Sequence, residues 1–207
     1  ILWCQDEFEA DIISLSLGGE QQVQMQTEGS SVSAVRRAVD SGIFVVAAAG
    51  NDGGSGDDGL VSVPGNVPRV ITVGASTQEQ TVWMNSSSGS QTLSDGTSRQ
   101  SPHLKPEVIA PGENIISTGA GDQWYSSSGT SDSTVFVTGA LSLILEAYPQ
   151  FRPTADSNGD CIDHVKNSLK ETSLKYQLSV EHDDRWGYGQ LQAFDWYQDL
   201  ALQPWTC

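Results

Sequence analysis

The sequence has 207 residues, a length typical of one α/β domain, and 37% of them are hydrophobic. Its 26 acidic and 10 basic residues give a formal net charge of −16, which argues against nucleic acid or anionic lipid as a partner because both need a basic surface. The chain contains no run of about 18 apolar residues of the kind that spans a membrane.

Strand-like and helix-like segments alternate along the chain. Short apolar runs predict strands at 11–17, 43–49, 70–74, 108–110 and 115–116. Helical spacing or amphipathic patterns predict helices at 30–39, 135–148, 161–169 and 191–200, the first of them capped by Ser30 or Ser31. The polar, Gly/Ser-rich stretch 86–102 predicts a surface loop.

This alternation predicts an α/β fold with a mostly parallel sheet. We find no internal repeat and no linker that would divide the chain, so residues 1–207 are predicted to form part or all of a single domain.

A serine-rich segment, Ser126 to Ser131, comes immediately before the longest apolar helix. Backbone N–H groups and the dipole at a helix N-terminus favour a developing oxyanion, so a serine placed there is a candidate nucleophile. Gly129 would allow close backbone approach, and Ser131 would be the attacking residue. Gly-Thr-Ser before a helix is also a common capping sequence, and this simpler interpretation stays open on these residues alone.

Other segments accompany this one in a fixed order. They are SLSLGG (14–19), AAAGN (47–51), PRVITVGA (68–75), KPEVIAPG (105–112) and, after GTS (129–131), WGYGQL (186–191). As an ordered set they resemble the subtilase family of serine proteases over essentially the whole chain. The resemblance implies that the chain is the C-terminal part of a subtilisin-like three-layer fold.

The resemblance implies specific site residues. Ser131 matches the catalytic serine, and Asn51 matches the side-chain donor of the oxyanion hole. The resemblance also implies three groups of substrate-binding residues. Ser16, Leu17 and Gly18 form a strand edge, and Thr130 lies beside the nucleophile. Ala48, Ala49 and Gly50 form one wall of the pocket, and Ser62 belongs to the other. Ser62 stands where the family often has glycine, which would make the pocket shallower and more polar. A family turn that resembles 63–68 implies a cis peptide bond between Val63 and Pro64.

The segment after the nucleophile departs from the family pattern. Asp132 replaces the usual methionine, and Val135-Phe136 replaces the usual Pro-His pair. A carboxylate beside a developing oxyanion opposes catalysis, so in an enzyme we expect Asp132 to point away from that space. We expect Val135 and Phe136 to pack into the core and leave the cleft open.

Family order places the catalytic Asp and His upstream of the Ser16-Leu17-Gly18 strand, and the chain begins too close to that strand to contain them. It also starts without Met, so we expect a piece of a longer protein, completed by a missing N-terminal half or by another chain. His103, His164 and His182 fall at positions that the family does not use for chemistry, and we interpret each as a surface or locally hydrogen-bonded residue.

No cofactor is implied. The carboxylates of Asp52, Asp57 and Asp58 are suited to calcium, with a solvated acidic loop as the alternative. Cys4, Cys161 and Cys207 are odd in number, so at least one cysteine is free or pairs with another chain. The scattered acids resemble those of proteins from salt-loving organisms, or of an ordinary acidic enzyme that acts outside the cell or at its surface.

Two functions remain open from the sequence. The first is a serine endopeptidase acting on extended peptides, in which Ser131 attacks and an absent segment supplies the base. The second is a catalytically decayed subtilase-like module with a structural or peptide-binding role. The intact residues Gly129, Thr130, Ser131 and Asn51 favour the first, and Asp132 with Val135 and Phe136 favours the second.

Overall fold

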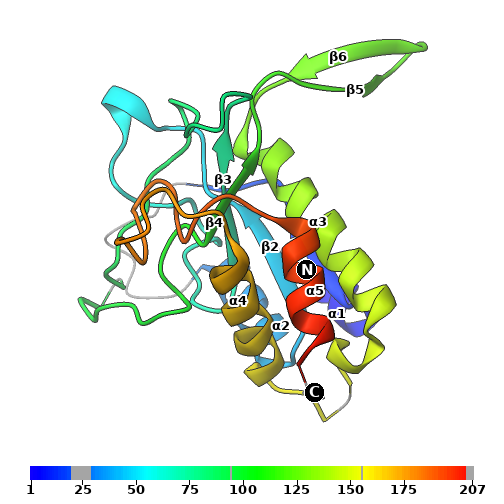
Figure 1. Cartoon of the computed structure of the whole chain (residues 1–207). Helices are drawn as coiled ribbons and strands as arrows, with labels where there is room; N and C mark the ends of the chain where they lie inside the picture. Colours follow the sequence, from blue (N-terminus) through cyan, green and yellow to red (C-terminus); the bar gives the residue numbers. More distant parts are fainter. Residues whose placement is uncertain (20–28, 94, 155, 204–207) are drawn as a thin grey trace.

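The computed structural model describes residues 1–19, 29–93, 95–154 and 156–203. Its centre is a parallel sheet of four strands in sequence order, β1 (Ile12–Leu15), β2 (Phe44–Ala48), β3 (Ile71–Ser76) and β4 (Val108–Pro111) (Figure 1). Every residue of β2 and β3 is buried, as expected for continuous apolar runs covered on both faces. The predicted α/β fold with a mostly parallel sheet is therefore confirmed.

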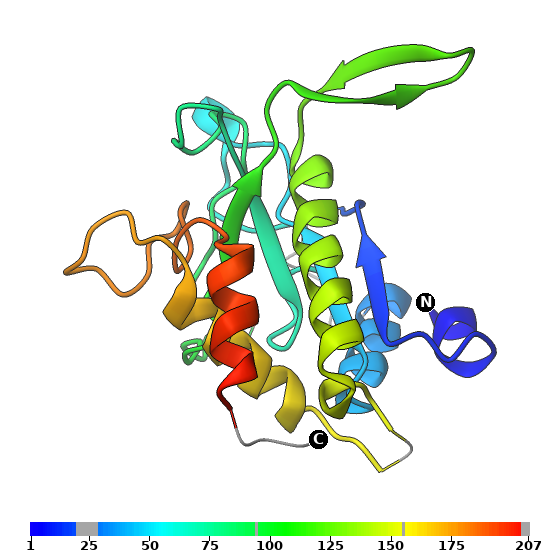
Figure 2. The same ribbon diagram turned by 45° about the vertical axis from the view of Figure 1, so that its right-hand side comes forward.

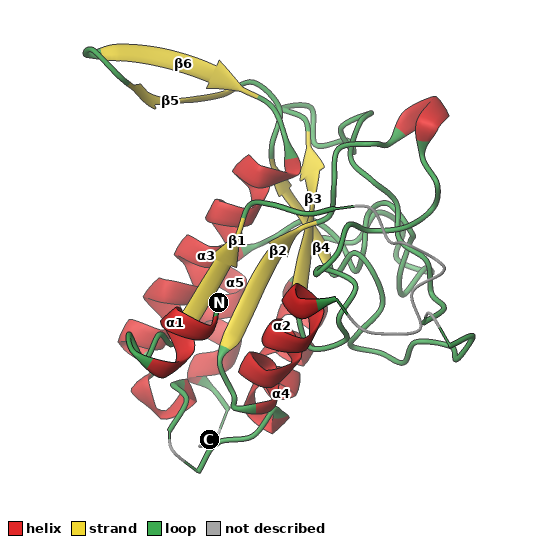
Figure 3. Cartoon of the chain, turned by 180° about the vertical axis from the view of Figure 1, so that it is seen from behind, coloured by secondary structure: helices red, strands yellow, loops and turns green. Residues whose placement is uncertain are grey.

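Helices cover both faces of the sheet. The long helix α3 (Thr130–Ala147) packs across all four strands, and α2 (Ser30–Asp40) packs against β2 on the opposite face (Figures 2 and 3). Helices α4 (Asp160–Thr172) and α5 (Ala193–Ala201) pack against each other, and α5 also contacts α3. The core is formed where the buried stripe of α3 meets the sheet.

The remaining elements lie at the margins. A short helix α1 (Leu2–Asp6) precedes β1, and 3-10 turns occupy Gly54–Gly56 and Pro149–Phe151. Strands β5 (Ile115–Gly119) and β6 (Gln123–Ser127) form an antiparallel hairpin that extends away from the body (Figure 2). None of the described helices has the length and hydropathy that a membrane-spanning helix needs.

Some element boundaries differ from the sequence predictions. The N-cap of α2 is Gly29 without a side-chain hydrogen bond, so neither Ser30 nor Ser31 is the cap. Helix α3 begins at Thr130, ahead of the predicted start at 135. The stretch 86–102 is irregular as predicted, but Ser86 and Ser87 at its beginning are buried, because they support the loops beside Gly50.

The outer edge of β1 is open. Among the described residues β1 pairs with β2 alone, through the parallel register from Ile12 to Leu15, and it forms one margin of the sheet (Figure 3). A strand in that position presents unpaired N–H and C=O groups along one side. The described residues therefore leave this edge of the sheet unpaired.

Candidate active site

Ser131 lies at the carboxyl end of the sheet, where α3 begins. Gly129 precedes the helix, and its N–H donates to the carbonyl of Gly112 at 2.8 Å, which ties the helix N-terminus to the end of β4. The Ser131 hydroxyl donates to the carbonyl of Ser16 at 3.2 Å, and the Ser16 hydroxyl donates to the Ser131 carbonyl at 3.0 Å. The candidate nucleophile is thus in direct contact with the segment that follows β1.

Asn51 is held in a defined orientation by Thr130. Its Oδ1 atom accepts the Thr130 N–H at 2.9 Å and lies 2.9 Å from the Thr130 hydroxyl. The same hydroxyl lies 3.1 Å from the N–H of Gly50, so the loop after β2 is joined to the start of α3. With its oxygen engaged in this way, Asn51 has its Nδ2 donor group left for another acceptor.

The Asn51 amide and the helix N-terminus converge on the space beside Gly129. A Cβ atom built on Gly129 would lie 3.5 Å from Asn51 Nδ2. Ser131 is the second residue of α3, and the first N–H groups of a helix have no intrahelical acceptor. An amide donor therefore lies near the positive end of a helix dipole, and both kinds of group can stabilise a developing oxyanion.

The loops around Gly50 form a tightly packed wall. Gly50 has φ +117°, and a Cβ there would lie 2.5 Å from the hydroxyl oxygens of both Ser62 and Ser87, so only glycine fits. The Ser62 N–H donates to the Ala49 carbonyl at 2.6 Å, and Ala48 and Ala49 are buried. The structure thus places two hydroxyl groups against Gly50, and the predicted Ser62 is one of them.

The strand edge after β1 reaches the same wall. Gly19 and Val63 form an antiparallel bridge, and a Cβ on Gly18 would lie 2.6 Å from that of Ser62. The Val63-Pro64 peptide bond is cis, as predicted. Leu17 is 61% exposed, so the side of this segment that would meet a peptide is open.

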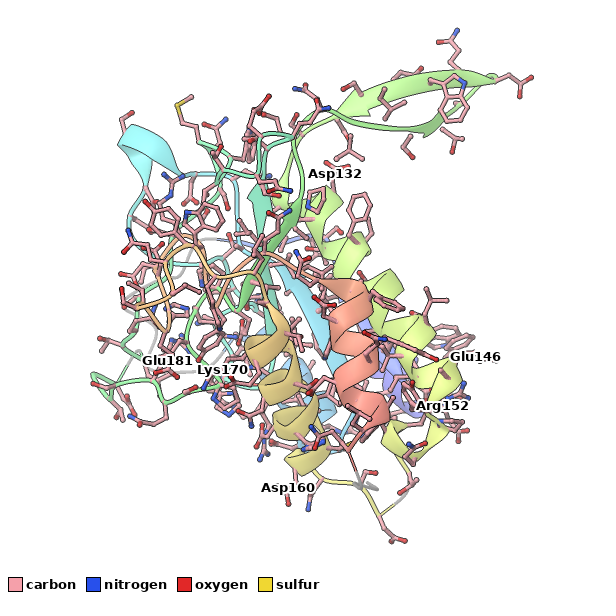
Figure 4. The ribbon with its side chains drawn as sticks, viewed as in Figure 1. Asp132, Glu146, Arg152, Asp160, Lys170 and Glu181 are labelled. Atoms are coloured by element: carbon pink, nitrogen blue, oxygen red, sulfur yellow. The ribbon has the colours of Figure 1, made fainter. Side chains whose placement is uncertain are left out.

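Asp132 does not turn fully away from the site. Its Oδ1 atom accepts the Ser127 hydroxyl of β6 at 2.6 Å, and its Oδ2 atom lies 3.7 Å from the Cβ position of Gly129. The same position is 3.5 Å from Asn51 Nδ2, so amide and carboxylate flank one glycine. Figure 4 shows Asp132 at the tip of α3, at the root of the hairpin.

Val135 and Phe136 do not pack into the core, and this expectation is wrong. Their exposed fractions are 55% and 43%. The buried stripe of α3 includes Thr134, Val137 and Leu141, with the spacing of one helix face, and residues 135 and 136 lie beside it. Asn51 and Asp132, and neither of these two residues, flank the space beside Gly129. Val135 and Phe136 instead form an apolar surface on the outside of the helix.

The three histidines are engaged elsewhere. His103 Nδ1 lies 3.0 Å from Lys166 Nζ, and burial together with that lysine lowers the pKa of His103 to about 3. His182 Nε2 lies 2.9 Å from the Pro106 carbonyl, and burial lowers its pKa as well. His164 stacks on Phe151, beyond the far end of α3. These partners support the interpretation of all three as structural residues.

The acidic loop binds its own backbone. Asp57 accepts the N–H groups of Gly59 at 2.9 Å and Ser88 at 3.1 Å, and Asp58 accepts that of Leu60 at 2.9 Å. Asp52 is paired with the Ser87 hydroxyl. In the described part of the chain no three His, Cys, Asp or Glu side chains are grouped as metal ligands would be.

Sequence reasoning missed the hydroxyl groups that support the site. Ser86 accepts the Ala75 N–H at 3.0 Å, and the Ser87 N–H donates to the Gly50 carbonyl at 3.0 Å. The sequence offered one signal, the three consecutive serines at 86–88, but their polarity alone suggested a surface loop.

The structure is an α/β fold in which Ser131 lies at the start of α3, at the carboxyl end of a parallel sheet, and sequence comparison assigns its family. The sequence profile of the subtilase family matches residues 2–189, so the chain belongs to that family. The serine protease AprX of Bacillus subtilis (strain 168) is 34% identical over 202 residues, which are 88% of this chain and 42% of AprX. A subtilisin of Bacillus pumilus is 38% identical over 141 residues, which are 67% of this chain and 44% of that protein.

A solved structure agrees with this assignment. The self-cleaved protease domain of PatA superimposes with a TM-score of 0.67 at 26% identity, covering 93% of this chain and 62% of that chain. The chain therefore spans less than half the length of the two curated relatives and less than two thirds of the solved domain.

Proposed function

We propose that the chain is the nucleophile-bearing part of a serine endopeptidase. The observation that carries the proposal is the Asn51–Thr130 contact, in which Asn51 Oδ1 accepts the Thr130 N–H at 2.9 Å. This contact leaves the amide donor 3.5 Å from the Cβ position of Gly129, two residues before Ser131. A purely structural helix cap needs the oxygen of Asn51, but it gives no reason for a serine at the next helical position.

In this proposal Ser131 Oγ attacks the carbonyl carbon of a peptide bond. A general base takes the hydroxyl proton, and the former carbonyl oxygen becomes an oxyanion that accepts hydrogen bonds from Asn51 Nδ2 and from the Ser131 N–H. Collapse of this intermediate releases the amine, which receives the proton, and leaves an acyl group on Ser131. Water then releases the acid by the same sequence of steps.

The base comes from outside these residues. No described histidine contacts Ser131, and hydrogen bonds or ring contacts hold all three histidines to other residues. The exposed Val135 and Phe136 lie within about one and a half turns of Ser131 on α3, and Thr138 of the same helix contacts Ser14 of β1 at 3.0 Å. We propose that an N-terminal segment or a second chain covers this part of α3 and the open edge of β1 and brings a histidine, oriented by an aspartate, to the Ser131 hydroxyl.

The proposed substrate is an extended peptide. The segment Ser16-Leu17-Gly18 follows an edge strand, and main-chain pairing at such an edge binds a peptide with little demand on its sequence. Ala48, Ala49 and Gly50 would form one wall of the side-chain pocket, and Ser62 the other.

The proposed reaction uses no cofactor, and the proposed location is outside the cell or at its surface. Cys161 is disulfide-bonded, whereas Cys4 is free; Cys207 lies outside the described residues. Disulfides persist in oxidising compartments, and this supports an extracellular location.

A fluorophosphonate probe tests the proposal, because it labels a serine only when that serine is activated as a nucleophile. In the protein joined to its base-supplying segment, mass spectrometry is expected to find the label on Ser131, and the Ser131→Ala variant is expected to stay unlabelled. Asn51→Ala is expected to lower peptide hydrolysis by roughly 10²–10³, a magnitude taken from subtilisin, a relative of this chain. Labelling that persists in Ser131→Ala would refute the assignment.

The same experiment separates the endopeptidase from a decayed module. The observation that favours decay is the Asp132 carboxylate beside Gly129, because its charge opposes an oxyanion there. If the joined and folded protein leaves Ser131 unlabelled but still binds peptides, the structural or peptide-binding role replaces the enzymatic one.

A further inference from the structure

Asp132 is the charged group nearest to the candidate nucleophile in the sequence, and the proposed reaction gives it no task. One of its oxygens is engaged by Ser127 at 2.6 Å, and the other faces the space beside Gly129. The side chain is only partly buried, so a ligand can reach it. A carboxylate in this position weakens oxyanion stabilisation unless a positive charge compensates for it.

The segments that build this end of the sheet contain no positive charge in their sequences. Lys, Arg and His are all absent from residues 1–35, 38–68 and 106–151, which include Ser16, Asn51, Ser62 and Ser131. Arg185 does reach this end of the sheet, but its guanidinium donates to the carbonyls of Trp83 and Met84. A cationic ligand at Asp132 would therefore approach loops whose own charged residues are all acidic, in a protein of net charge −16.

The contacts of the nucleophile indicate which part of a peptide would meet Asp132. Ser131 contacts Ser16 on the β1 side, whereas Asp132 contacts Ser127 on the hairpin side. A peptide that pairs with 16–18 and is cleaved at Ser131 would leave this strand edge at the scissile bond and continue toward the root of the hairpin, where Figure 4 shows Asp132. The residues after the scissile bond would then pass the Asp132 carboxylate.

We propose that Asp132 selects substrates with Lys or Arg on the C-terminal side of the scissile bond. This inference rests on the proposed peptidase function and names its substrate class. The cation would pair with Asp132 Oδ2 while Ser127 holds Oδ1. Neutralised by the substrate, the carboxylate would oppose the oxyanion less, so a basic residue would improve catalysis as well as binding.

Binding is measured with the Ser131→Ala protein joined to its base-supplying segment, so that no turnover is needed. The probes are fluorescent peptides that carry arginine or its uncharged isostere citrulline at one position before or after the scissile bond. We expect an arginine preference of about three- to fivefold, the range of a partly exposed ion pair, for positions after the bond only. The preference is expected to fall as salt increases.

Two variants that each remove one negative charge distinguish a direct contact with Asp132 from the general attraction of an acidic protein for a cationic peptide. Asp132→Asn keeps an acceptor for the Ser127 hydroxyl and is expected to abolish the arginine preference. Asp122→Asn removes the same charge from the distal turn of the hairpin, at a position with φ +56° that asparagine tolerates, and is expected to retain it. Asp132→Lys is expected to reverse the preference, so that glutamate binds better than glutamine.

Three results would overturn the inference: equal loss of preference in Asp132→Asn and Asp122→Asn, a preference confined to positions before the scissile bond, or no preference at all. Fluorophosphonate labelling of Ser131 is read separately in the same protein with Ser131 restored. A labelled Ser131 without arginine preference refutes the role of Asp132 alone, whereas arginine preference without labelling refutes the peptidase function alone.

Discussion

The two ends of the parallel sheet differ in whether their polar and charged side chains are accessible or buried and paired. At the carboxyl end, Ser131, Asn51 and Asp132 are accessible and keep part of their hydrogen-bonding capacity free. At the amino ends of β3 and β4, Glu107 is buried and its Oε1 atom lies 2.8 Å from Lys105 Nζ and 2.6 Å from Lys166 Nζ. Both lysines also donate to the Val70 carbonyl, so each buried ammonium group has more than one acceptor.

The buried ion pairs that stabilise the fold and the candidate catalytic residues therefore lie at opposite ends of the sheet. Desolvation lowers the pKa of both buried lysines, which means that burying their charge is costly and that Glu107 is essential to them. The site around Ser131 has no comparable buried ion pair in the described residues. We therefore expect the largest losses of stability from substitutions at the amino end, and changes in catalysis from substitutions at the carboxyl end.

The largest expected effect is that of Glu107→Gln. Two buried ammonium groups lose their counter-charge, so the free energy of unfolding is expected to fall by about 3–5 kcal/mol. The matched control is Glu181→Gln, which removes the exposed carboxylate from the 2.8 Å pair with Lys170 and is expected to cost at most about 1 kcal/mol. Urea titrations of both variants measure the difference, and equal losses would contradict the comparison.

The next effect is acid sensitivity at the amino end. His103 has a pKa of about 3 in the folded protein and 6.5 without these contacts, because it is buried beside Lys166, Lys105 and Arg69. Between these values the unfolded chain binds a proton that the native chain does not, so stability is lost as pH falls from 6.5 toward 3. His103→Asn keeps an acceptor for Lys166 and is expected to flatten this part of the stability profile. An unchanged profile in the variant would assign the loss to other groups.

At the carboxyl end, Gly50→Ala is expected to destabilise the fold by about 1–3 kcal/mol, because Gly50 has φ +117°. Its methyl group would also meet the hydroxyls of Ser62 and Ser87 at 2.5 Å. Gly121→Ala is the control, since Gly121 has φ +73° and open space around it, so it reports the backbone strain alone. Thermal melts that show equal losses would mean that the two serines move aside freely.

Gly129→Ala is expected to change stability least. It tests most directly whether a substitution at the carboxyl end can lower catalysis without lowering stability. Its φ of 171° suits any residue and the new methyl group meets only ordinary contacts, so unfolding is expected to change by less than about 0.5 kcal/mol. The methyl group would nevertheless lie between the Asn51 amide and the Asp132 carboxylate. Hydrolysis by the joined protein is expected to fall by about tenfold to a hundredfold. Full activity would show that this space is not the oxyanion site.

The sequence predicted the parallel sheet well, because its strands are continuous apolar runs that only burial on both faces explains. The residues around the nucleophile were found by their order along the chain, which allowed Ser131, Asn51 and the cis bond at Pro64 to be proposed together. The contacts among these residues could not be predicted from the sequence, because Ser131 contacts Ser16, which lies 115 positions away.

Other features left little or no signal in the sequence. In the exposed hairpin only the first two residues of β5, Ile115 and Ile116, were predicted as a strand, and β6 becomes a strand by pairing with β5. Val135 and Phe136 were assigned to the core by hydrophobicity, but the rotation of α3 turns them outward. The buried Glu107–Lys166 contact joins a strand entrance to a helix, and no local pattern predicts such a contact.

The open edge of β1 also determines how the isolated chain behaves in solution. An unpaired strand edge beside exposed apolar side chains is a template for self-association, and mutual repulsion at a net charge of −16 opposes it. Salt screens this repulsion over a few ångströms and leaves the apolar contact intact. The isolated chain should thus stay dispersed in dilute buffer and aggregate as salt is added, and a covering segment should remove that response.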